Sequence, residues 1–413
     1  MRDGWREVSL GDVAARRADF TPVVADHLYR VVGVQRSGWG LVDREPARGD
    51  SMKFGKLMQL HVGDLVYRTI TAFEAPSTVV SPAYAGAFVT PQAFPVYSID
   101  RTQLLPGFMK LLTTSPTFHE EMAARCVGTV LRRKTLSKGA FESIPIALPS
   151  LAKQRRIVDL MASADDAIDA ADAEAEATAT SLSSAMAEIV RFGAGSSQPL
   201  VDLFETTLGG AWGLPAGADE QDVTALGPSA YKGGEVAVDP AVGATRSLSI
   251  KRAAARALRV GDIVLERSGG SPTQPVGRVI RMEEEHPWVV PSDFMRLLRV
   301  DRTRADPGFV FWCLWSAYRS GLARPFQKRT TSIFNLNITE YLASVRVGVP
   351  DIESQRDIAA LGDAGWAAVV AVRATADALR TLRSNLLSVL LSGKHEIPSS
   401  YDHLLDLDVE AAT

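Results

Sequence analysis

The sequence predicts an α+β protein in which two mixed α/β domains form a pseudo-two-fold repeat, separated by two long antiparallel coiled-coil helices. Three observations predict it: an internal repeat at a constant offset, a strand that ends at a proline at the same point of each copy, and a heptad pattern after each proline. A chain of 413 residues is also too long for one ordinary hydrophobic core.

The repeat rests on three pairs of segments that match in the same order. They are 60–68 with 258–267, 98–108 with 299–309, and 144–158 with 345–359. The last two pairs share an offset of 201 residues, which indicates a duplicated unit rather than chance similarity.

Each copy is expected to contain the same elements in the same order. These are a strand after a Gly-Asp turn (65–67, 263–265), a helix (107–126, 308–324), and an alternating apolar strand that stops at Pro149 or Pro350. A polar, basic segment precedes the last strand in both copies. The domains are therefore expected to be rich in short strands.

A long helix is predicted after each proline, with Ser150 or Asp351 as the N-cap. Mostly apolar or small residues recur at steps of three and four, at 154, 157, 161, 164, 168, 171, 175, 178, 182, 185 and 189, and at the same positions plus 201. This heptad spacing favours two helices that pair with each other. The alternative is that each helix lies separately on its own domain.

The predicted boundaries follow from these elements. They are a first α/β domain at 1–149, a central spacer helix at 150–192, a second α/β domain at 197–349, a distal spacer helix at 350–395 and a C-terminal tail at 396–413.

Composition restricts the class of protein. With 46% hydrophobic and 23% charged residues, the chain reads as a globular protein. No uninterrupted apolar run reaches the roughly 18 residues of a membrane span, and the N-terminus lacks a signal-peptide core, so we expect a cytoplasmic protein without a membrane partner. Cys126 and Cys313 build no disulfide framework, and the six histidines show no metal-ligand spacing.

The net charge of −3 conceals an alternation along the chain. Residues 1–150 carry 18 basic and 14 acidic side chains, and 197–349 carry 18 and 16, whereas both predicted helical segments are acidic. Any DNA-binding surface is therefore expected on the two α/β domains and not on the helices.

No catalytic residues are predicted. The chain has no dinucleotide fingerprint, no P-loop and no Asn-Pro-Pro-Tyr sequence of an adenine methyltransferase. Asp351 and Glu353 lie at a helix start, where acids cap amides, and the Gly-rich run 268–271 is explained as a turn. The sequence indicates a binding protein.

The repeated junction resembles that of type I restriction–modification specificity subunits. The resemblance rests on residues 144–157, where apolar-Pro-apolar-x-Leu-Pro precedes Leu-x-x-Gln-Arg-x-Ile, on the opening 5–12, and on 260–271. It covers nearly the whole chain. The first copy departs from it at 67–70, where Tyr-Arg-Thr-Ile replaces a Gly-rich or Lys-bearing turn.

This resemblance implies a non-catalytic subunit that reads a bipartite, asymmetric target in double-stranded DNA. It also implies that the two α/β domains are target-recognition domains, each of which reads one half of the target. It also implies two modification subunits as partners, with restriction subunits in some systems. The modification subunits would hold S-adenosylmethionine and methylate adenine, so no cofactor is expected in this chain. An adaptor of another defence complex and a protein-binding scaffold remain as alternatives.

Candidate DNA contacts are polar or basic residues of predicted loops, because loops on a rigid scaffold carry recognition. The candidates are Arg36, Lys53, Lys56, Arg68, Arg132, Arg133, Lys134, Arg246, Lys251, Arg252, Arg267, Ser268, Lys328, Arg329 and Thr331. The runs 130–139 and 327–335 occupy the same place in the two copies, which is the strongest reason to prefer them. A solvated surface charge is the alternative for each.

Candidate partner contacts are the polar residues repeated at the two helix starts. They are Gln154, Arg155, Gln355 and Arg356. The alternative is that these residues bond backbone groups or the facing helix.

Overall fold

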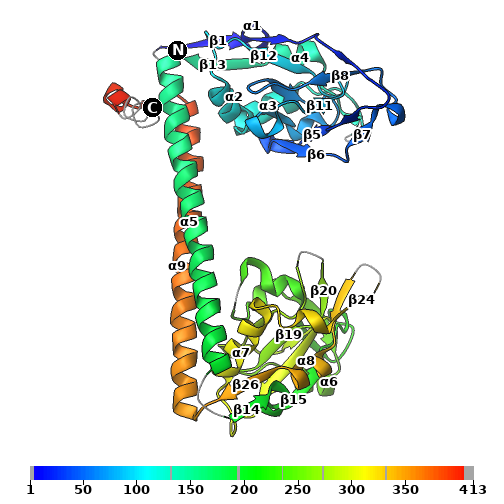
Figure 1. Ribbon diagram of the computed structural model, residues 1–413, viewed down its shortest axis with the longest axis vertical. Coiled ribbons are helices and arrows are strands. Elements are labelled where there is room, and N and C mark those ends of the chain that lie inside the picture. Colours follow the sequence, from blue (N-terminus) through cyan, green and yellow to red (C-terminus); the bar gives the residue numbers. More distant parts are fainter. Residues whose placement is uncertain are drawn as a thin grey trace. The chain divides into compact units, whose positions relative to one another are not determined.

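The computed structural model describes residues 4–130, 133–192, 196–234, 236–271, 274–330 and 333–403. The chain divides into two compact units, Met1–Ala170 with Thr375–Thr413, and Ala171–Ala374. Unit 1 and unit 2 each combine a globular part with portions of both long helices, α5 (Leu151–Phe192) and α9 (Ile352–Leu391) (Figure 1).

The central sheets of the two units have the same topology, which confirms the duplication. In unit 1 the strand order is β10-β9-β12-β2, formed by Ser77–Val79, Leu65–Tyr67, Val96–Ile99 and Ala14–Arg16. In unit 2 the order is β21-β19-β23-β15, formed by Val279–Arg281, Ile263–Glu266, Met295–Val300 and Phe204–Gly209. All of these pairs are antiparallel.

A second pair of strands is also common to both units. In unit 1, β1 (Trp5–Ser9) pairs with β13 (Pro145–Pro149); in unit 2, β14 (Ser196–Pro199) pairs with β26 (Arg346–Val349). β13 and β26 are the alternating apolar strands predicted from the sequence, and each leads into a long helix.

The helix expected at 107–126 is in fact two helices, whereas its counterpart in unit 2 is one. Unit 1 has α2 (Pro106–Thr113) and α3 (Pro116–Ala124), and unit 2 has α7 (Pro307–Arg319). Pro116 cannot donate a backbone hydrogen bond, and the hydroxyl of Ser115 accepts from the Phe118 amide as an N-cap, so a new helix starts there.

A short helix precedes the last strand in both units. It is α4 (Lys138–Glu142) in unit 1 and α8 (Ile338–Ser344) in unit 2.

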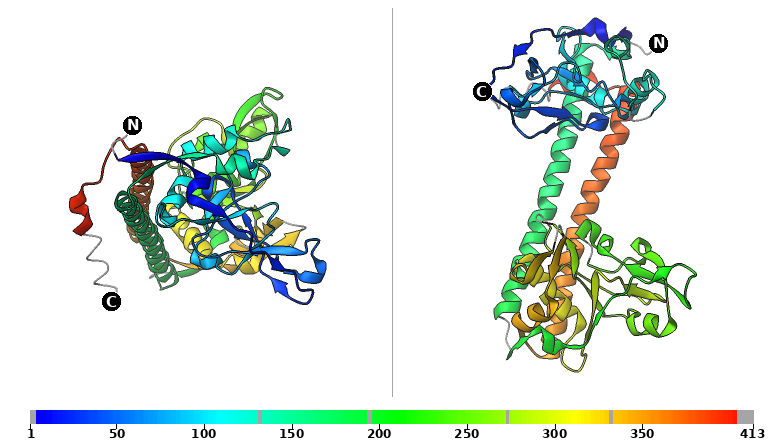
Figure 2. Two further views of the ribbon diagram at one scale, coloured as in Figure 1. Left: turned by 90° about the horizontal axis from the view of Figure 1, so that it is seen from above. Right: turned by 90° about the vertical axis from the view of Figure 1, so that its right-hand side faces the viewer.

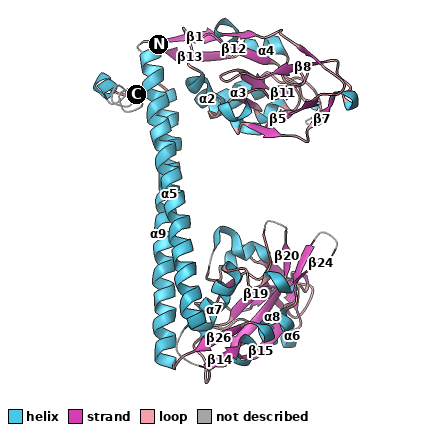
Figure 3. Cartoon of the chain, viewed as in Figure 1, coloured by secondary structure: helices cyan, strands magenta, loops and turns pink. Residues whose placement is uncertain are grey.

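Most of the remaining elements differ between the units. Unit 1 adds the sheet β11-β8-β3 (Phe88–Val89, Lys56–Gln59, Thr21–Pro22), the pairs β4–β7 (Leu28–Tyr29, Ala47–Arg48) and β5–β6 (Val32–Val34, Leu41–Asp43), and the short helix α1 (Leu10–Val13). Unit 2 adds the sheets β16-β18-β17-β22 (Leu214–Pro215, Ala244–Leu248, Gln221–Leu226, Val289–Pro291) and β20-β25-β24 (Ser268–Gly270, Ile333–Leu336, Gln327–Thr330), with the helix α6 (Ile250–Arg256) (Figure 3).

The two long helices pair with each other in both units, and this confirms the predicted antiparallel pair (Figures 1 and 2). In unit 1 the Arg383 guanidinium of α9 binds both carboxylate oxygens of Asp165 of α5, with Nη2 2.9 Å from Oδ2. In unit 2 Gly365 of α9 faces Leu182 of α5, so closely that a Cβ at residue 365 would lie 2.6 Å from a Leu182 methyl.

The helices also pack on the globular parts, so the alternative arrangement is partly present as well. Ile157 of α5 and Leu390 of α9 belong to the core of unit 1, whereas Met186 of α5 and Val369 of α9 belong to the core of unit 2. Each unit therefore takes one stretch from each helix into its own core.

One position of the predicted heptad pattern is wrong. Ala185 is exposed, and the neighbouring Met186 is fully buried in its place. Met186 belongs to the core that also holds the aromatic residues of α7, so packing on the globular part displaces the apolar face at this end of α5.

Among the described residues, α9 is long and apolar enough to cross a membrane, with a window of mean hydropathy 1.3. The sequence expectation of no such segment considered only uninterrupted apolar runs. In unit 2 the apolar Trp366 and Val369 of this helix are buried, and Asp363 pairs with Arg281. Packing against protein thus explains part of the apolar character of α9 there.

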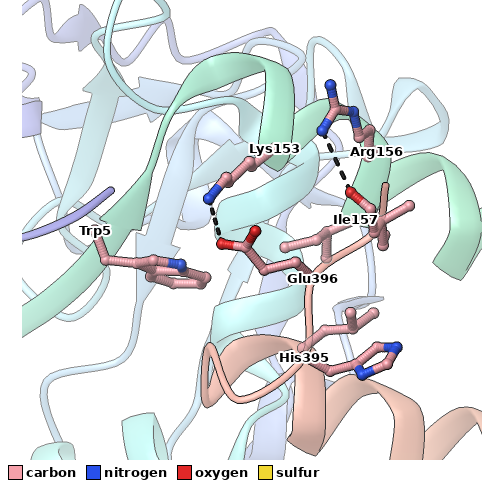
Figure 4. A pocket seen from close by; sticks show the side chains of 8 residues that line it. Trp5, Lys153, Arg156, Ile157, His395 and Glu396 are labelled. Carbon is pink, nitrogen blue, oxygen red and sulfur yellow. Dashed lines mark hydrogen bonds and ion pairs between the residues drawn. The ribbon is translucent and has the colours of Figure 1, made fainter. Parts of the chain in front are cut away.

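The segment after α9 packs on the first turns of α5, within unit 1. The Arg156 guanidinium binds both carboxylate oxygens of Asp402, at 2.5 and 2.6 Å, and donates to the Ile397 carbonyl at 3.3 Å. Lys153 pairs with Glu396 at 2.5 Å (Figure 4). The cavity among these side chains is about 10 Å³, which is room for one water molecule at most and too small for a ligand.

Candidate nucleic-acid interface

Hairpins occur at equivalent points of the two units. In unit 1 the hairpin lies between α3 and α4, and in unit 2 between α7 and α8. In unit 1, hairpin 1 (residues 127–130 and 133–135) is closed by reciprocal backbone hydrogen bonds of 2.9 Å between Val127 and Thr135. In unit 2, hairpin 2 (residues 327–330 and 333–336) is formed by β24 and β25.

Both hairpins are attached to the framework in the same way. The amide of Leu136 donates to the Thr69 carbonyl just after β9, at 2.9 Å. The amide of Leu336 donates to the Arg267 carbonyl just after β19, at 2.8 Å. The segment that returns from each hairpin is thus fixed to the end of a central strand, which gives both hairpins an ordered base.

The structure therefore brings several sequence-predicted residues together in each unit. Those around hairpin 1 are Arg68, Arg133 and Lys134; those around hairpin 2 are Arg267, Ser268, Lys328 and Arg329. Arg132 and Thr331 lie outside the described residues. Arg133, Arg267, Lys328 and Arg329 are exposed, as a contact with DNA requires.

Two of these residues also have partners inside the fold. Arg68 is half-buried and pairs with Glu74 at 2.9 Å while its Nε donates to the Ile70 carbonyl. Ser268 is buried, and its hydroxyl donates to the Asn335 side chain across β20 and β25. Ser268 thus stabilises the base of hairpin 2, and the predicted DNA contact through its side chain is not supported.

A buried ion pair stabilises the framework beneath hairpin 2. Glu266 is fully buried at the end of β19 and accepts two hydrogen bonds from Arg278, at 2.6 and 2.8 Å. Burial opposes the charge on Arg278, but the hydrogen bonds and negative charge of Glu266 outweigh it and raise the pKa of Arg278. The Arg278 guanidinium therefore remains charged at neutral pH.

The sequence did not single out Arg296, which lies on β23 near Arg267. Burial, together with the positive charge of Arg267, lowers the pKa of Arg296. Its Nε is buried and has no hydrogen-bond partner among the described residues. A guanidinium whose Nε lacks a hydrogen-bond partner, beside the exposed Arg267, adds to the positive character of this end of unit 2. No sequence pattern marks it, because its environment comes from strand pairing.

The other predicted DNA contacts lie elsewhere in their units. Arg36 is exposed in the turn between β5 and β6, and Lys53 and Lys56 are exposed before and at the start of β8. Lys251 and Arg252 are exposed on α6.

Arg246 of β18 is half-buried and already engaged. It donates to the Trp212 and Gly213 carbonyls, and its guanidinium lies 4.8 Å from the centroid of the Trp212 ring. A structural role accounts for this side chain.

The two glutamines proposed as partner contacts are buried, which corrects that prediction. Gln154 accepts from the Leu105 amide at 2.9 Å and donates to the Gln103 and Pro149 carbonyls at 2.9 and 3.0 Å. Gln355 accepts from the Asp306 amide at 2.7 Å and donates to the Pro350 carbonyl at 2.8 Å.

The neighbouring Arg155 and Arg356 are exposed and remain candidate partner contacts. Within the part of the chain that the structure describes, no group of three or more His, Cys, Asp or Glu side chains could hold a metal ion.

No protein-family model and no curated protein matches the sequence. The chain is, however, similar to several solved structures. The chain is similar to one from a study of complex assembly and conformational transition of the type I R-M system, with 17% identity, a TM-score of 0.60, and coverage of 94% of this chain and 98% of that one. It is also similar to the HsdS subunit from Thermoanaerobacter tengcongensis (19% identity, TM-score 0.46, coverage 96% and 98%) and to the type I restriction–modification S subunit from M. genitalium (12%, 0.45, 94% and 96%). The first likeness establishes that this chain has the fold of that type I R-M protein over nearly its whole length.

Proposed function

We propose that this chain is the DNA sequence-specificity subunit of a type I restriction–modification methyltransferase. It reads a bipartite, asymmetric target and positions adenine-methylating partner subunits, without catalysing a reaction itself. One observation carries the proposal: two units of identical central topology present hairpins of different sequence at the same point. A common framework with unlike projections suits two half-targets of different sequence.

The fold likeness and the basic hairpins support this proposal. Exposed arginine and lysine side chains can bind phosphates and the edges of guanine bases. The partners are double-stranded DNA, two modification subunits and, in some systems, restriction subunits, all in the cytoplasm. S-adenosylmethionine binds to the modification subunits, and exposed Arg155 and Arg356 are the surface proposed to meet them.

The first test is the methylome of the host. A split motif carrying N6-methyladenine is expected, and it disappears when this gene is deleted. If all adenine methylation persists after deletion, this chain is not the specificity subunit.

Hairpin 2 offers a sharper test. In the assembled complex, Lys328→Ala with Arg329→Ala is expected to weaken target binding by about 1–3 kcal/mol for each base that the hairpin no longer binds. Arg304→Ala is the matched control, because Arg304 is an exposed arginine of the same unit that lies outside the hairpin. Equal affinity of the double variant and the control excludes hairpin 2 from the DNA interface.

A further inference from the structure

An open cavity of about 300 Å³ lies in unit 1, beside hairpin 1's attachment point. Its lining is Val34, Gln35, Arg36, Trp39, Val42, Arg44, Arg68 and Glu74. Sites for small molecules start at roughly this volume, about 300–1,000 Å³. Three arginines and one glutamate line it, which gives a formal charge of +2 and favours an anion.

Trp39 supplies an aromatic surface in this cavity. Its side chain is 64% exposed, and the Arg36 guanidinium lies 4.8 Å from the ring centroid. An indole with a cation near its ring and much of its surface open can stack a further planar group.

Arg44 supplies an available charge. Its side chain is exposed and has no hydrogen bond or ion pair within the described part of the chain. A Cβ on Gly33 would come 2.9 Å from the Arg44 Nε, so the glycine of β5 makes room for this guanidinium. Arg68 is held in place by Glu74 and by the Ile70 carbonyl.

The backbone around the cavity is fixed in conformations that most residues avoid. Ser37, Thr71 and Ala75 all have positive φ, of 52°, 54° and 49°. Gly38, with φ of 72°, lies so close to α2 that a Cβ there would be 2.5 Å from the Thr113 carbonyl oxygen. Such strained positions concentrate at binding sites, where the fold over-determines the geometry.

We propose that this cavity binds one nucleotide, with its base stacked on Trp39 and its phosphate on Arg44 and the free N–H groups of Arg68. This rests on the proposed function, in which the nucleotide belongs to a bound DNA strand. A free nucleotide has the same chemistry, and the experiment separates the two sources.

The first arm measures target-duplex affinity of the assembled complex at two salt concentrations. Trp39→Ala is expected to weaken binding roughly 5- to 100-fold, because the base no longer has an indole to stack on, whereas Trp39→Phe keeps most of the affinity. Arg44→Gln is expected to weaken binding about tenfold and to lower the salt dependence by about one phosphate contact. Both side chains are exposed, so the thermal unfolding midpoint should not change.

The second arm titrates the full chain with deoxyadenosine monophosphate. Binding that requires Trp39 and Arg44, without an effect of either variant on duplex affinity, assigns the site to a free nucleotide. Weaker binding with Arg44→Gln but not with Trp39→Ala indicates an anion site without a stacked base and overturns the assignment. So does wild-type affinity of both variants in both arms. A wild-type complex that binds no duplex contradicts the proposed function, and the second arm still decides on the cavity.

Discussion

At the scale of single residues, Gln154 and Gln355 show why the repeat keeps a glutamine at the start of each long helix. Each side chain accepts a hydrogen bond from the backbone amide directly before α2 or α7. It also donates to the carbonyl of Pro149 or Pro350, where the chain leaves the last strand for the long helix. One buried amide thus ties a strand, a domain helix and a long helix together. This explains the repeated residue without a partner protein.

Replacing Gln154 by Ala is expected to destabilise unit 1 by about 1–3 kcal/mol. The change removes the hydrogen-bond partner of the Leu105 amide and of the Pro149 carbonyl. Because the Gln154 side chain is fully buried, water does not replace it, and both groups stay desolvated without a hydrogen bond. Denaturant unfolding measures this loss of unfolding free energy. Arg155→Ala, an exposed change one residue away, should stay within about 0.5 kcal/mol of wild type. Equal stability of the two variants would contradict the structural role.

The ion pair of Arg156 with Asp402 should make the docking of the C-terminal segment sensitive to pH only under acidic conditions. The hydrogen bonds from Arg156 hold the pKa of Asp402 below its ordinary value of 3.8. A carboxyl whose pKa is lowered in the folded state stabilises that state above the unfolded pKa and loses the effect as pH falls through the folded pKa. The segment should therefore stay docked from pH 8 to about 5 and be released only below about pH 4.

The δ1-methyl resonance of Ile397, followed by NMR during a pH titration, reports this docking because Arg156 also bonds the Ile397 carbonyl. Asp402→Asn should shift that resonance towards the released position already at neutral pH. A midpoint near pH 6 in the wild type would mean that another group controls the segment.

At the scale of elements, the sequence predicts boundaries best where a local signal begins or ends a helix or strand. The long helices begin at Leu151 and Ile352, directly after the caps that follow Pro149 and Pro350. The break between α2 and α3 was missed, although Ser115 and Pro116 form a recognisable helix start.

The repeat in the sequence aligns two basic segments, and the structure folds both into hairpins; their contact with DNA stays a prediction. The sequence reasoning failed for burial. The burial of Gln154, Gln355 and Ser268 was not foreseen, because the sequence does not show which polar side chains pack against a neighbouring element. Trp39 and Arg44 were missed for the same reason: their cavity forms only when segments 34–44 and 68–74 come together.

Gly362 of α9 provides a test of how tightly a long helix packs on unit 2. Helix propensity alone predicts that Gly362→Ala stabilises the protein by about 1 kcal/mol. A Cβ there would lie 2.5 Å from the ring of Trp312, which is fully buried and donates a hydrogen bond to Asp363 at 2.8 Å. Because that ring cannot move away, we expect destabilisation by about 1–3 kcal/mol instead.

Gly365→Ala is the matched control in the same helix. Its new Cβ would meet the end of the Leu182 side chain, which can change rotamer, so its cost should be clearly smaller. Thermal and denaturant unfolding of both variants decide the matter. Destabilisation of the same size in both would mean that the contact with Trp312 is not the cause.

At the scale of the whole molecule, the duplication has produced two units that each depend on both long helices. The core of unit 1 includes Ile157 and Met161 of α5 with Leu387 and Leu390 of α9. The core of unit 2 includes other stretches of the same two helices. Neither globular part is therefore completed by the long helix that follows it alone, and a substitution far along the chain can act on either unit.

Two substitutions in α9 should consequently destabilise different units. Leu390→Ala removes a side chain that is 1% exposed in the core of unit 1, and Val369→Ala one that is fully buried in the core of unit 2. Truncating a buried leucine to alanine costs about 2–5 kcal/mol, and the smaller valine less. Hydrogen exchange measured by mass spectrometry should show faster exchange in the central sheet of unit 1 for Leu390→Ala and in that of unit 2 for Val369→Ala. If both variants accelerate exchange equally in both sheets, the two units unfold as one, and the stretches of α9 do not stabilise them separately.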